Sequence, residues 1–330
     1  VNLNSSFAHL LTRPDAWLDL DTILSDSVRN EYLPNLWQAS QIDGRSFAIP
    51  WYCTTSITIY NSELFKRAKV DEPPTNYTEL AKVARQIKEK TDKYAFFVSF
   101  LPEGGNEVLE SFGKMGVDLI DVDGKAAFNT PVGEAVFKYW VDLYREGLLP
   151  KEVLTEGIQA GEDLYQAGET AMVFSGPEFI EAISKNTPEI GKVSFPISQI
   201  TGKTDKKGIM LMNFAISRNT KLPDGALKFV LFITNYHNQM VFAQETNVLP
   251  STTKTLENSY FQNISSDAST QERGRVISAG QIFAAEVLLP PIKNLDKLKQ
   301  IIYQNLQGAM LGEKTIEQAI ADAASEWNKL

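Results

Sequence analysis

The feature that most constrains this chain is the alternation of strand-like and helix-like segments along its length. Residues 56–60 alternate in character and are rich in β-branched side chains, which predicts a strand. Continuous apolar runs at 94–100, 170–176 and 207–217 predict buried strands. Between these runs lie segments with helical spacing, such as residues 135–149, which Gly147 terminates. This alternation predicts an α/β protein with mainly parallel sheets.

Three further segments have a pattern that predicts secondary structure. A helix over 224–235 is expected to turn Ala226, Phe229, Val230 and Ile233 inward. Residues 295–330 are typical of two helices broken at Gly312. Residues 1–4 have the character of a buried strand with no partner strand before it, so we expect the numbered chain to begin inside a domain.

Composition excludes several classes of protein. The chain has 330 residues, enough for two domains, and its 43% hydrophobic and 22% charged residues are ordinary for a globular protein. A net charge of -9 argues against nucleic-acid binding, which needs a basic surface. No apolar run reaches the roughly 18 residues of a membrane span, and the first residues do not have a signal-peptide pattern.

The chain is poor in residues that bind metals or act as nucleophiles. Cys53 is the single cysteine, and its apolar neighbours favour a buried, inert thiol. His9 and His237 are the only histidines, which excludes a multi-histidine metal site. The acidic stretch 118–123 lacks the glutamate that would close a calcium loop, so a polar hairpin is favoured there. We therefore expect no metal, no cofactor and no catalytic residue.

Aromatic, amide, hydroxyl and carboxylate side chains gather at the ends of the predicted strands. Such ends form ligand crevices in α/β proteins. Planar polar groups beside aromatic rings suit a sugar, whose apolar face stacks on a ring. Core packing is the alternative for Trp51 and Phe179 taken singly. The candidates are Asn4, Ser5, Ser6, Trp51, Tyr52, Thr54, Glu103, Asn106, Glu178, Phe179 and Asn213.

Several blocks of the chain resemble one known family when they are taken in order. Residues 164–177, "LYQAGETAMVFSGP", resemble the hallmark segment of the extracellular solute-binding proteins of sugar ABC importers, the family that includes maltose-binding protein. Each block alone is weak, whereas their order and spacing are specific and cover essentially the whole chain. The other blocks are residues 43–68, 72–88, 228–258 and 312–330.

The resemblance implies a two-lobed periplasmic-binding-protein fold of the class II type, with a hinge of crossing strands. It places residues 1–53 and 213–270 in an N-terminal lobe that lacks its first strand-helix-strand unit. It places residues 57–210 and 275–330 in a C-terminal lobe. The hinge is then expected near 53–56, 211–214 and 270–275. Family members also begin with an export signal, which this chain does not show.

The resemblance also implies a function. The chain would be a non-enzymatic, monomeric receptor that captures a disaccharide, small oligosaccharide or glycoside and delivers it to the permease of an ABC importer. It would be periplasmic or extracytoplasmic, either free or lipid-anchored through a segment absent from this chain. The resemblance adds Met212 to the candidate residues. Ser6 and Glu178 depart from the maltose-binding pattern, which has an acidic residue and an aromatic residue at these positions.

Two alternatives stay open. The same fold could bind a polyamine or a glycerol phosphate ester, although no basic residue falls in the candidate loops, which argues against phosphate. A glycoside hydrolase would need two facing carboxylates, and Glu103 and Glu178 are the candidates for that pair.

Overall fold

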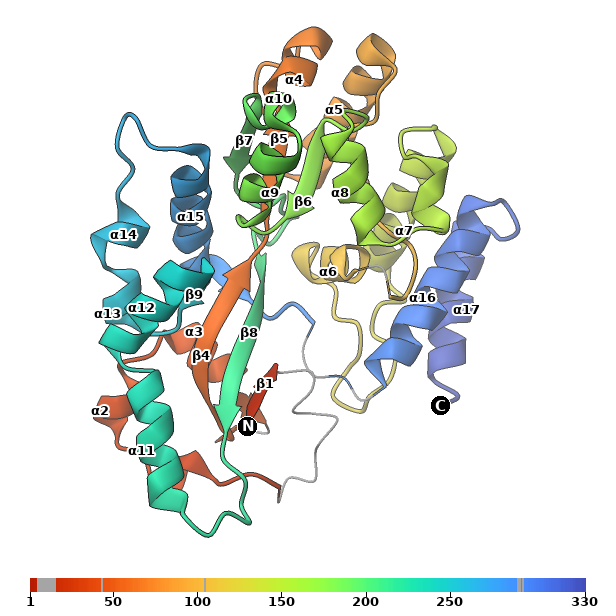
Figure 1. The fold of residues 1–330 in the computed structure, drawn as a ribbon. Helices are drawn as coiled ribbons and strands as arrows, with labels where there is room; N and C mark the ends of the chain where they lie inside the picture. Colours follow the sequence, from red (N-terminus) through yellow and green to blue (C-terminus); the bar gives the residue numbers. More distant parts are fainter. Residues whose placement is uncertain (5–15, 43, 104, 290–291, 293) are drawn as a thin grey trace. The chain divides into compact units, whose positions relative to one another are not determined.

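The chain divides into two compact units in the computed structural model (Figure 1). The structure describes residues 1–4, 16–42, 44–103, 105–289, 292 and 294–330. Unit 1 consists of residues 1–56, 176–178 and 207–293, and unit 2 consists of residues 57–175, 179–206 and 294–330. Both units mix helices with a sheet, so the chain is an α/β protein.

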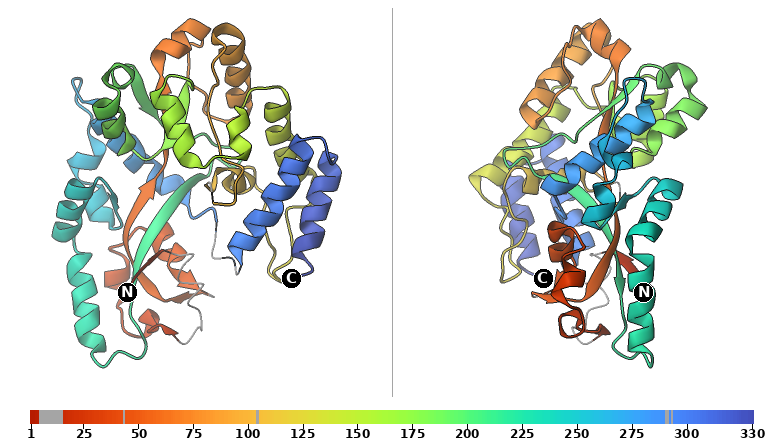
Figure 2. Two further views of the ribbon diagram at one scale, coloured as in Figure 1. Left: turned by 45° about the vertical axis from the view of Figure 1, so that its right-hand side comes forward. Right: turned by 90° about the vertical axis from the view of Figure 1, so that its left-hand side faces the viewer.

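Unit 1 is built on the long strands β4 and β8, which lie side by side in Figures 1 and 2. The sheet order is β1-β8-β4-β9, and β10 also pairs with β8, at its first two residues. The elements of unit 1 are β1 (Asn2–Asn4), η2 (Leu20–Thr22), α2 (Asp26–Arg29), α3 (Pro34–Ala39), β2 (Gln41–Ile42), β3 (Arg45–Ser46), β4 (Ala48–Thr55), β8 (Lys207–Ala215), α11 (Pro223–Ile233), α12 (Tyr236–Thr246), β9 (Leu249–Pro250), α13 (Thr253–Leu256), α14 (Ser259–Gln262), α15 (Thr270–Gln281), η4 (Ile282–Ala284) and β10 (Ala285–Glu286).

Unit 2 has a small sheet of order β6-β5-β7 surrounded by helices. Its C-terminal helices α16 and α17 pack against each other and against α7 (Figure 1). The elements of unit 2 are β5 (Ile57–Asn61), α4 (Ser62–Ala68), α5 (Tyr77–Thr91), α6 (Glu107–Lys114), α7 (Pro131–Arg145), η3 (Lys151–Leu154), α8 (Ile158–Gln166), β6 (Met172–Ser175), α9 (Phe179–Asn186), α10 (Pro188–Gly191), β7 (Ser194–Ile197), α16 (Leu295–Met310) and α17 (Ile316–Trp327).

Local sequence explains where these helices begin and end. Asn76 caps α5 by accepting a hydrogen bond from the Glu79 N–H, and Thr130 caps α7 in the same way, with Pro131 in the first turn. Gly147 and Gly312 follow α7 and α16 with φ of 70° and 82°, conformations that favour glycine. The predicted stops at both glycines are confirmed.

Strand direction differs from the expectation of mainly parallel sheets. Every pair among β1, β4, β8 and β9, and every pair among β5, β6 and β7, is antiparallel, and only β10 pairs in parallel with β8. The chain leaves unit 1 along β4 and returns along β8, so these neighbours must run in opposite directions. Residues 95–100 are buried, but within the predicted strand 94–100 only Tyr94 forms a bridge, to Thr170.

The chain passes from unit 1 to unit 2 after Ser56, returns to unit 1 at Lys207 and is again in unit 2 from Asn294. All of β8 belongs to unit 1 because it pairs with β4 from Ile209 to Ala215. Helix α15 also bonds to β4 in unit 1, with Gln281 Nε2 donating to Thr55 Oγ1 at 3.3 Å. The expected lobes and hinge stay a prediction.

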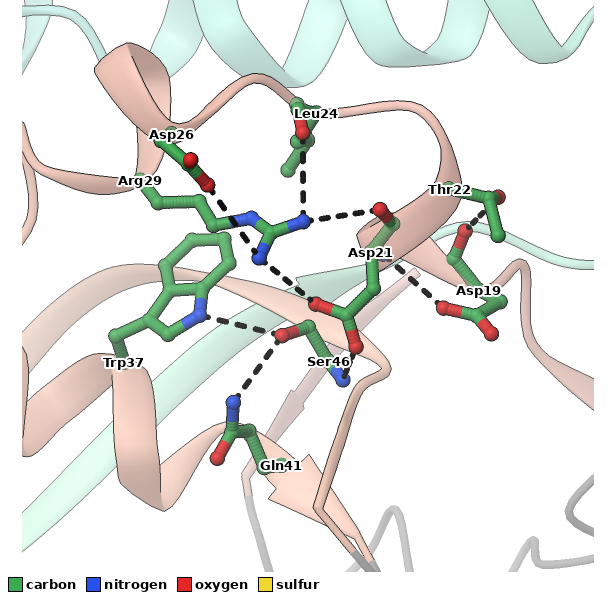
Figure 3. A network of polar contacts seen from close by, with 9 residues as sticks. All are labelled: Asp19, Asp21, Thr22, Leu24, Asp26, Arg29, Trp37, Gln41 and Ser46. Atoms are coloured by element: carbon green, nitrogen blue, oxygen red, sulfur yellow. Dashed lines mark hydrogen bonds and ion pairs between the residues drawn. The ribbon is translucent and has the colours of Figure 1, made fainter.

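A polar network fixes the segment that precedes β4 in unit 1 (Figure 3). The Asp21 carboxylate accepts a hydrogen bond from the Ser46 N–H at 2.8 Å and lies 3.4 Å from Arg29 Nη1. Trp37 Nε1 donates to Ser46 Oγ at 3.2 Å, and this bond links α3 to β3. Burial alone would raise the pKa of Asp21, but the bonds from Ser46 and the Arg29 charge hold it below its usual value.

Helix α11 turns most of the expected face inward. Val230 is buried, Ala226 packs against the same cluster and Ile233 is partly buried, but Phe229 is 57% exposed. The segment is apolar around most of its circumference, so its spacing does not single out one face. None of the described helices combines the length and the apolar character that crossing a bilayer would require.

Candidate functional site

Strand register brings four of the predicted ligand residues onto one face of the unit 1 sheet. Asn4 of β1 lies opposite Met212 of β8, and Met212 lies opposite Tyr52 of β4. Opposite residues on neighbouring strands share a face, and Thr54 shares it because it lies two residues after Tyr52. All four side chains are partly exposed. We call this surface, together with Trp51, Phe214 and Phe242, the aromatic face.

Trp51 joins the aromatic face because of a β-bulge. The register between β4 and β8 shifts between Pro50 and Tyr52, which leaves Trp51 without a partner on β8. Adjacent residues of a regular strand point to opposite faces, and the bulge removes that alternation. The Trp51 ring centroid lies 4.8 Å from that of Tyr52, 4.5 Å from that of Phe214 and 4.8 Å from that of Phe242.

The aromatic face has the groups that a sugar requires. Its rings offer apolar platforms, and Asn4 and Thr54 offer amide and hydroxyl groups at its margin. Trp51 Nε1 is buried and has no hydrogen-bond partner among the described residues. This donor could bond to a ligand hydroxyl, although other buried polar atoms of the described chain also lack a partner.

The opposite face of the same sheet is buried where Asn213 and Cys53 lie. Asn213 is fully buried, and its Oδ1 accepts a hydrogen bond from Ser40 Oγ at 2.6 Å. This placement differs from the expectation of ligand contact, because neighbouring Met212 and Asn213 point to opposite faces of β8. Cys53 is also fully buried, and burial raises its pKa to about 12. The prediction of an inert thiol is confirmed.

In unit 2, the loop that holds Glu103 and Asn106 is fixed from helix α16. Tyr303 Oη donates to the Gly105 carbonyl at 3.2 Å, and Gln307 Nε2 donates to the Phe100 carbonyl at 2.8 Å. Asn106 occupies the N-cap position of α6 without using its side chain as a cap, and Glu103 is exposed. The two α16 residues were not predicted, because they lie about 200 positions from the loop in sequence.

Glu107, the first residue of α6, is an unpredicted titratable group beside this loop. Its carboxylate folds over Gly105, where a Cβ atom would collide with it; Gly105 has φ of 136°. Burial raises the pKa of Glu107 to about 7, and the Glu110 carboxylate adds to the increase. The Lys299 ammonium opposes this increase.

Lys299 is a basic residue near the loop that holds Glu103 and Asn106. It extends from α16 and is close enough to Glu103, Glu107 and Asp296 for their charges to affect its pKa, which burial lowers. A basic residue therefore does reach the candidate loop, although none occurs within the loop's own sequence. Because three carboxylates surround this one ammonium group, the region stays acidic and remains unfavourable for a phosphate.

The corner after β6 separates Glu178 from Phe179. Residues 176–178 group with unit 1, whereas Phe179 begins α9 of unit 2. Glu178 is exposed and its carboxylate folds over Gly176, where an added Cβ would require that carboxylate to move. Phe179 is 7% exposed and belongs to the core, so it follows the alternative of core packing rather than the expectation of ligand contact.

The remaining expectations concern metals and residues that are not described. Ser5, Ser6 and His9 lie outside the described residues. Within the described part of the chain, no group of three or more His, Cys, Asp or Glu residues is arranged to hold a metal. The acidic stretch forms the predicted hairpin, with the Asp121 N–H donating to the Lys125 carbonyl at 2.8 Å.

Comparison with known proteins identifies relatives over most of the chain. A family model described as "Bacterial extracellular solute-binding protein" matches residues 2–240. A solved structure of a candidate oligosaccharide periplasmic-binding protein from Synechococcus sp. MITs9220 is 38% identical with a TM-score of 0.91, and the match covers 100% of this chain and 84% of that one.

Two curated relatives bear on the ligand. The diacetylchitobiose binding protein DasA of Streptomyces coelicolor is 26% identical over 243 residues, which cover 69% of this chain and 54% of DasA. The sn-glycerol-3-phosphate-binding periplasmic protein UgpB of Brucella abortus is 22% identical over 325 residues, which cover 91% of this chain and 71% of UgpB.

Proposed function

Because this chain belongs to the bacterial extracellular solute-binding protein family, we propose that it is the receptor of an ABC importer that captures a sugar and delivers it to the membrane permease. The observation that carries the sugar proposal is the aromatic face, where a bulge brings the partly exposed side chains of Trp51 and Tyr52 together. The ligand would be a disaccharide, a small oligosaccharide or a glycoside.

The proposed contacts are those that the structure leaves accessible. On the aromatic face, Trp51 and Tyr52 would stack on the sugar, while Asn4 and Thr54 would bond to its hydroxyls. Glu103, Asn106 and Glu178 are further candidates because none of them is buried. Asn213 and Phe179 would act by holding the strand and the helix to which they belong.

The relatives support a sugar over the alternatives. DasA is named for diacetylchitobiose and the Synechococcus protein is described as a candidate oligosaccharide-binding protein, whereas UgpB is named for sn-glycerol 3-phosphate. The acidic surroundings of Lys299 disfavour the phosphate. The family consists of binding proteins rather than enzymes, and a monomeric, extracytoplasmic receptor, free or lipid-anchored, is part of the proposal.

Calorimetric titration against a sugar panel tests the proposal. The panel contains glucose, maltose, maltotriose, diacetylchitobiose and sucrose, with sn-glycerol 3-phosphate and spermidine as the non-sugar arms. We expect at least one sugar to bind, and Trp51→Leu to weaken it by tenfold or more, about 1.4 kcal/mol. Tyr260→Leu is the matched control, since Tyr260 is a partly exposed aromatic residue of unit 1 outside the aromatic face.

Three results would contradict the proposal. They are the absence of heat with every sugar, binding of only the phosphate or the polyamine, and equal losses in Trp51→Leu and Tyr260→Leu. Hydrolysis of an aryl glycoside that disappears in Glu178→Gln would instead favour a glycosidase.

A further inference from the structure

A second concave site lies within unit 2, away from the loop at Glu103 and Asn106. It is a pocket of about 540 Å³, which is within the usual range for small-molecule sites. The start of α5, the middle of α6 and α7, and residues 202–203 form its walls. We call it the α5–α7 pocket. The residues used in the argument are Tyr77, Met115, Val136, Tyr139, Trp140 and Lys203.

Three aromatic rings form one side of the α5–α7 pocket. The ring centroids of Tyr77 and Tyr139 are 5.3 Å apart, those of Tyr139 and Trp140 are 5.0 Å apart, and all three rings meet edge to face. Such contacts hold the rings in fixed orientations. Burial raises the pKa of both tyrosines, so both hydroxyl groups are neutral and place no negative charge beside a ligand.

Several polar groups of the walls are already engaged in bonds within the protein, whereas Tyr139 Oη is buried without a hydrogen-bond partner among the described residues. Ser111 Oγ donates to the Val108 carbonyl and accepts a bond from Trp140 Nε1 at 3.0 Å. Asn76 Oδ1 caps α5 by accepting from the Glu79 N–H at 3.0 Å. A sugar that entered this pocket would leave most of its hydroxyls without partners, which is costly. The walls therefore favour an apolar ring.

Lys203 supplies the charge at the rim. It is exposed, and among the described residues it has no hydrogen bond or ion pair. The wall also includes Glu79, whose carboxylate accepts bonds from the Thr75 N–H and from Thr75 Oγ1, both at 2.8 Å; these bonds lower its pKa and keep it charged. Lys203 is the charged group of the wall that has no partner among the described residues, and it can pair with an anionic ligand.

The rim that carries Lys203 is fixed on both sides. The Tyr77 N–H donates to the Thr201 carbonyl at 3.1 Å, and Thr204 Oγ1 donates to the Lys114 carbonyl at 2.8 Å. Gly202 passes so close to the Lys114 carbonyl that a Cβ atom would collide with it. Because the backbone on either side of Lys203 is held, its charge stays near the pocket without a loop having to close.

We propose that the α5–α7 pocket binds a small aromatic carboxylate, with the ring against Tyr77, Tyr139 and Trp140 and the carboxylate paired with Lys203. This proposal does not rest on the sugar proposal, since none of its residues belongs to the aromatic face. For a ligand of about ten heavy atoms, we expect a Kd on the order of 0.1–1 mM.

Calorimetry with four matched compounds tests the proposal on the full chain. The compounds are phenylacetate, 2-phenylethanol, phenethylamine and phenylalanine, which share a ring and differ in charge. We expect phenylacetate to bind at least tenfold more tightly than the other three, and its affinity to fall as salt rises. Saturating the protein with a bound sugar, if one is found, should leave this affinity unchanged.

Two variants and one control locate the binding. Lys203→Gln should weaken phenylacetate about tenfold and remove its advantage over 2-phenylethanol. Ala135→Trp, at an exposed wall position, should fill the pocket and abolish binding of all four compounds. Lys66→Gln, an exposed lysine on α4 outside the pocket, should change nothing.

The proposal is overturned if no compound binds, if all four bind equally, or if phenylalanine binds more tightly than phenylacetate. It is also overturned if phenylacetate binds unchanged in Lys203→Gln. That variant lies at the surface, so its unfolding midpoint should match the unmodified protein, and a loss of binding can then be assigned to the charge.

Discussion

Glu107 makes the stability of unit 2 depend on pH in a direction opposite to most carboxylates. Its pKa is raised from 4.5 to about 7, first by burial and then by the neighbouring Glu110. Below pH 4.5 the Glu107 carboxyl group is protonated in both the folded and the unfolded chain and causes no loss of stability. Between 4.5 and 7 the unfolded chain releases the proton first, so the folded state loses stability as pH rises.

The size of the effect follows from the shift. A difference of about 2.5 pKa units, at 1.36 kcal/mol each, amounts to about 3 kcal/mol above pH 7. Glu107→Gln removes the ionisation, so at pH 8 the variant should be more stable by up to about 3 kcal/mol. A negative charge in the first turn of α6 is worth about 0.3–1 kcal/mol, and its loss reduces that gain.

Urea unfolding at pH 4.5, 6, 7 and 8 measures this difference between the original chain and Glu107→Gln. We expect the two proteins to agree most closely at pH 4.5 and to diverge steadily up to pH 8. Glu103→Gln is the control, because Glu103 is exposed and should change stability by less than about 0.5 kcal/mol. If Glu107→Gln has the same pH dependence as the original chain, the carboxylate is not desolvated and the reasoning is refuted.

Three further predictions concern stability. Tyr139 Oη is buried without a partner among the described residues, so Tyr139→Phe should be neutral or stabilising; Tyr165→Phe, which loses a 2.8 Å hydrogen bond, should cost about 1 kcal/mol in urea unfolding. The pKa of Asp21 is lowered in the folded state, so its carboxylate stabilises the fold above its unfolded pKa, and this stability is lost as pH falls through the folded pKa. Asp21→Asn should therefore flatten the acid limb of a curve of unfolding free energy against pH. Gly133→Ala should lower the thermal midpoint even though Ala favours helices, because its Cβ would collide with the Phe128 carbonyl; an unchanged or higher midpoint would contradict this.

The sequence was sufficient where one strong local signal decided the structure. The strands β5, β6 and β8 and the helices α7, α16 and α17 lie where hydrophobic spacing and glycine stops predicted them. It was insufficient where a segment is apolar on both sides. In β8, Met210 is 59% exposed and Leu211 is 2% exposed, so hydrophobicity could not reveal which face carries the ligand residues.

The candidate site shows the same limit. The pair Trp51 and Tyr52 was predicted as a site, but two adjacent strand residues share a face only because of a bulge that no residue pattern announced. Lys299, Tyr303 and Gln307 reach the loop of Glu103 from a distant helix, and such contacts depend on tertiary packing rather than on local spacing. Residue type was therefore a better guide to the site than position along a strand.

In two corners of the chain a glutamate side chain folds back over a glycine. Glu107 folds over Gly105 and Glu178 folds over Gly176, in each case two residues after the glycine. A Cβ at either glycine would meet the carboxylate, so a substitution there would require the glutamate side chain to move. The chemical outcomes nevertheless differ, because Glu107 is enclosed and its pKa is raised, whereas Glu178 is exposed to solvent. Glu178 can therefore accept a hydrogen bond from a ligand hydroxyl, whereas the ionisation of Glu107 changes the stability of the fold with pH.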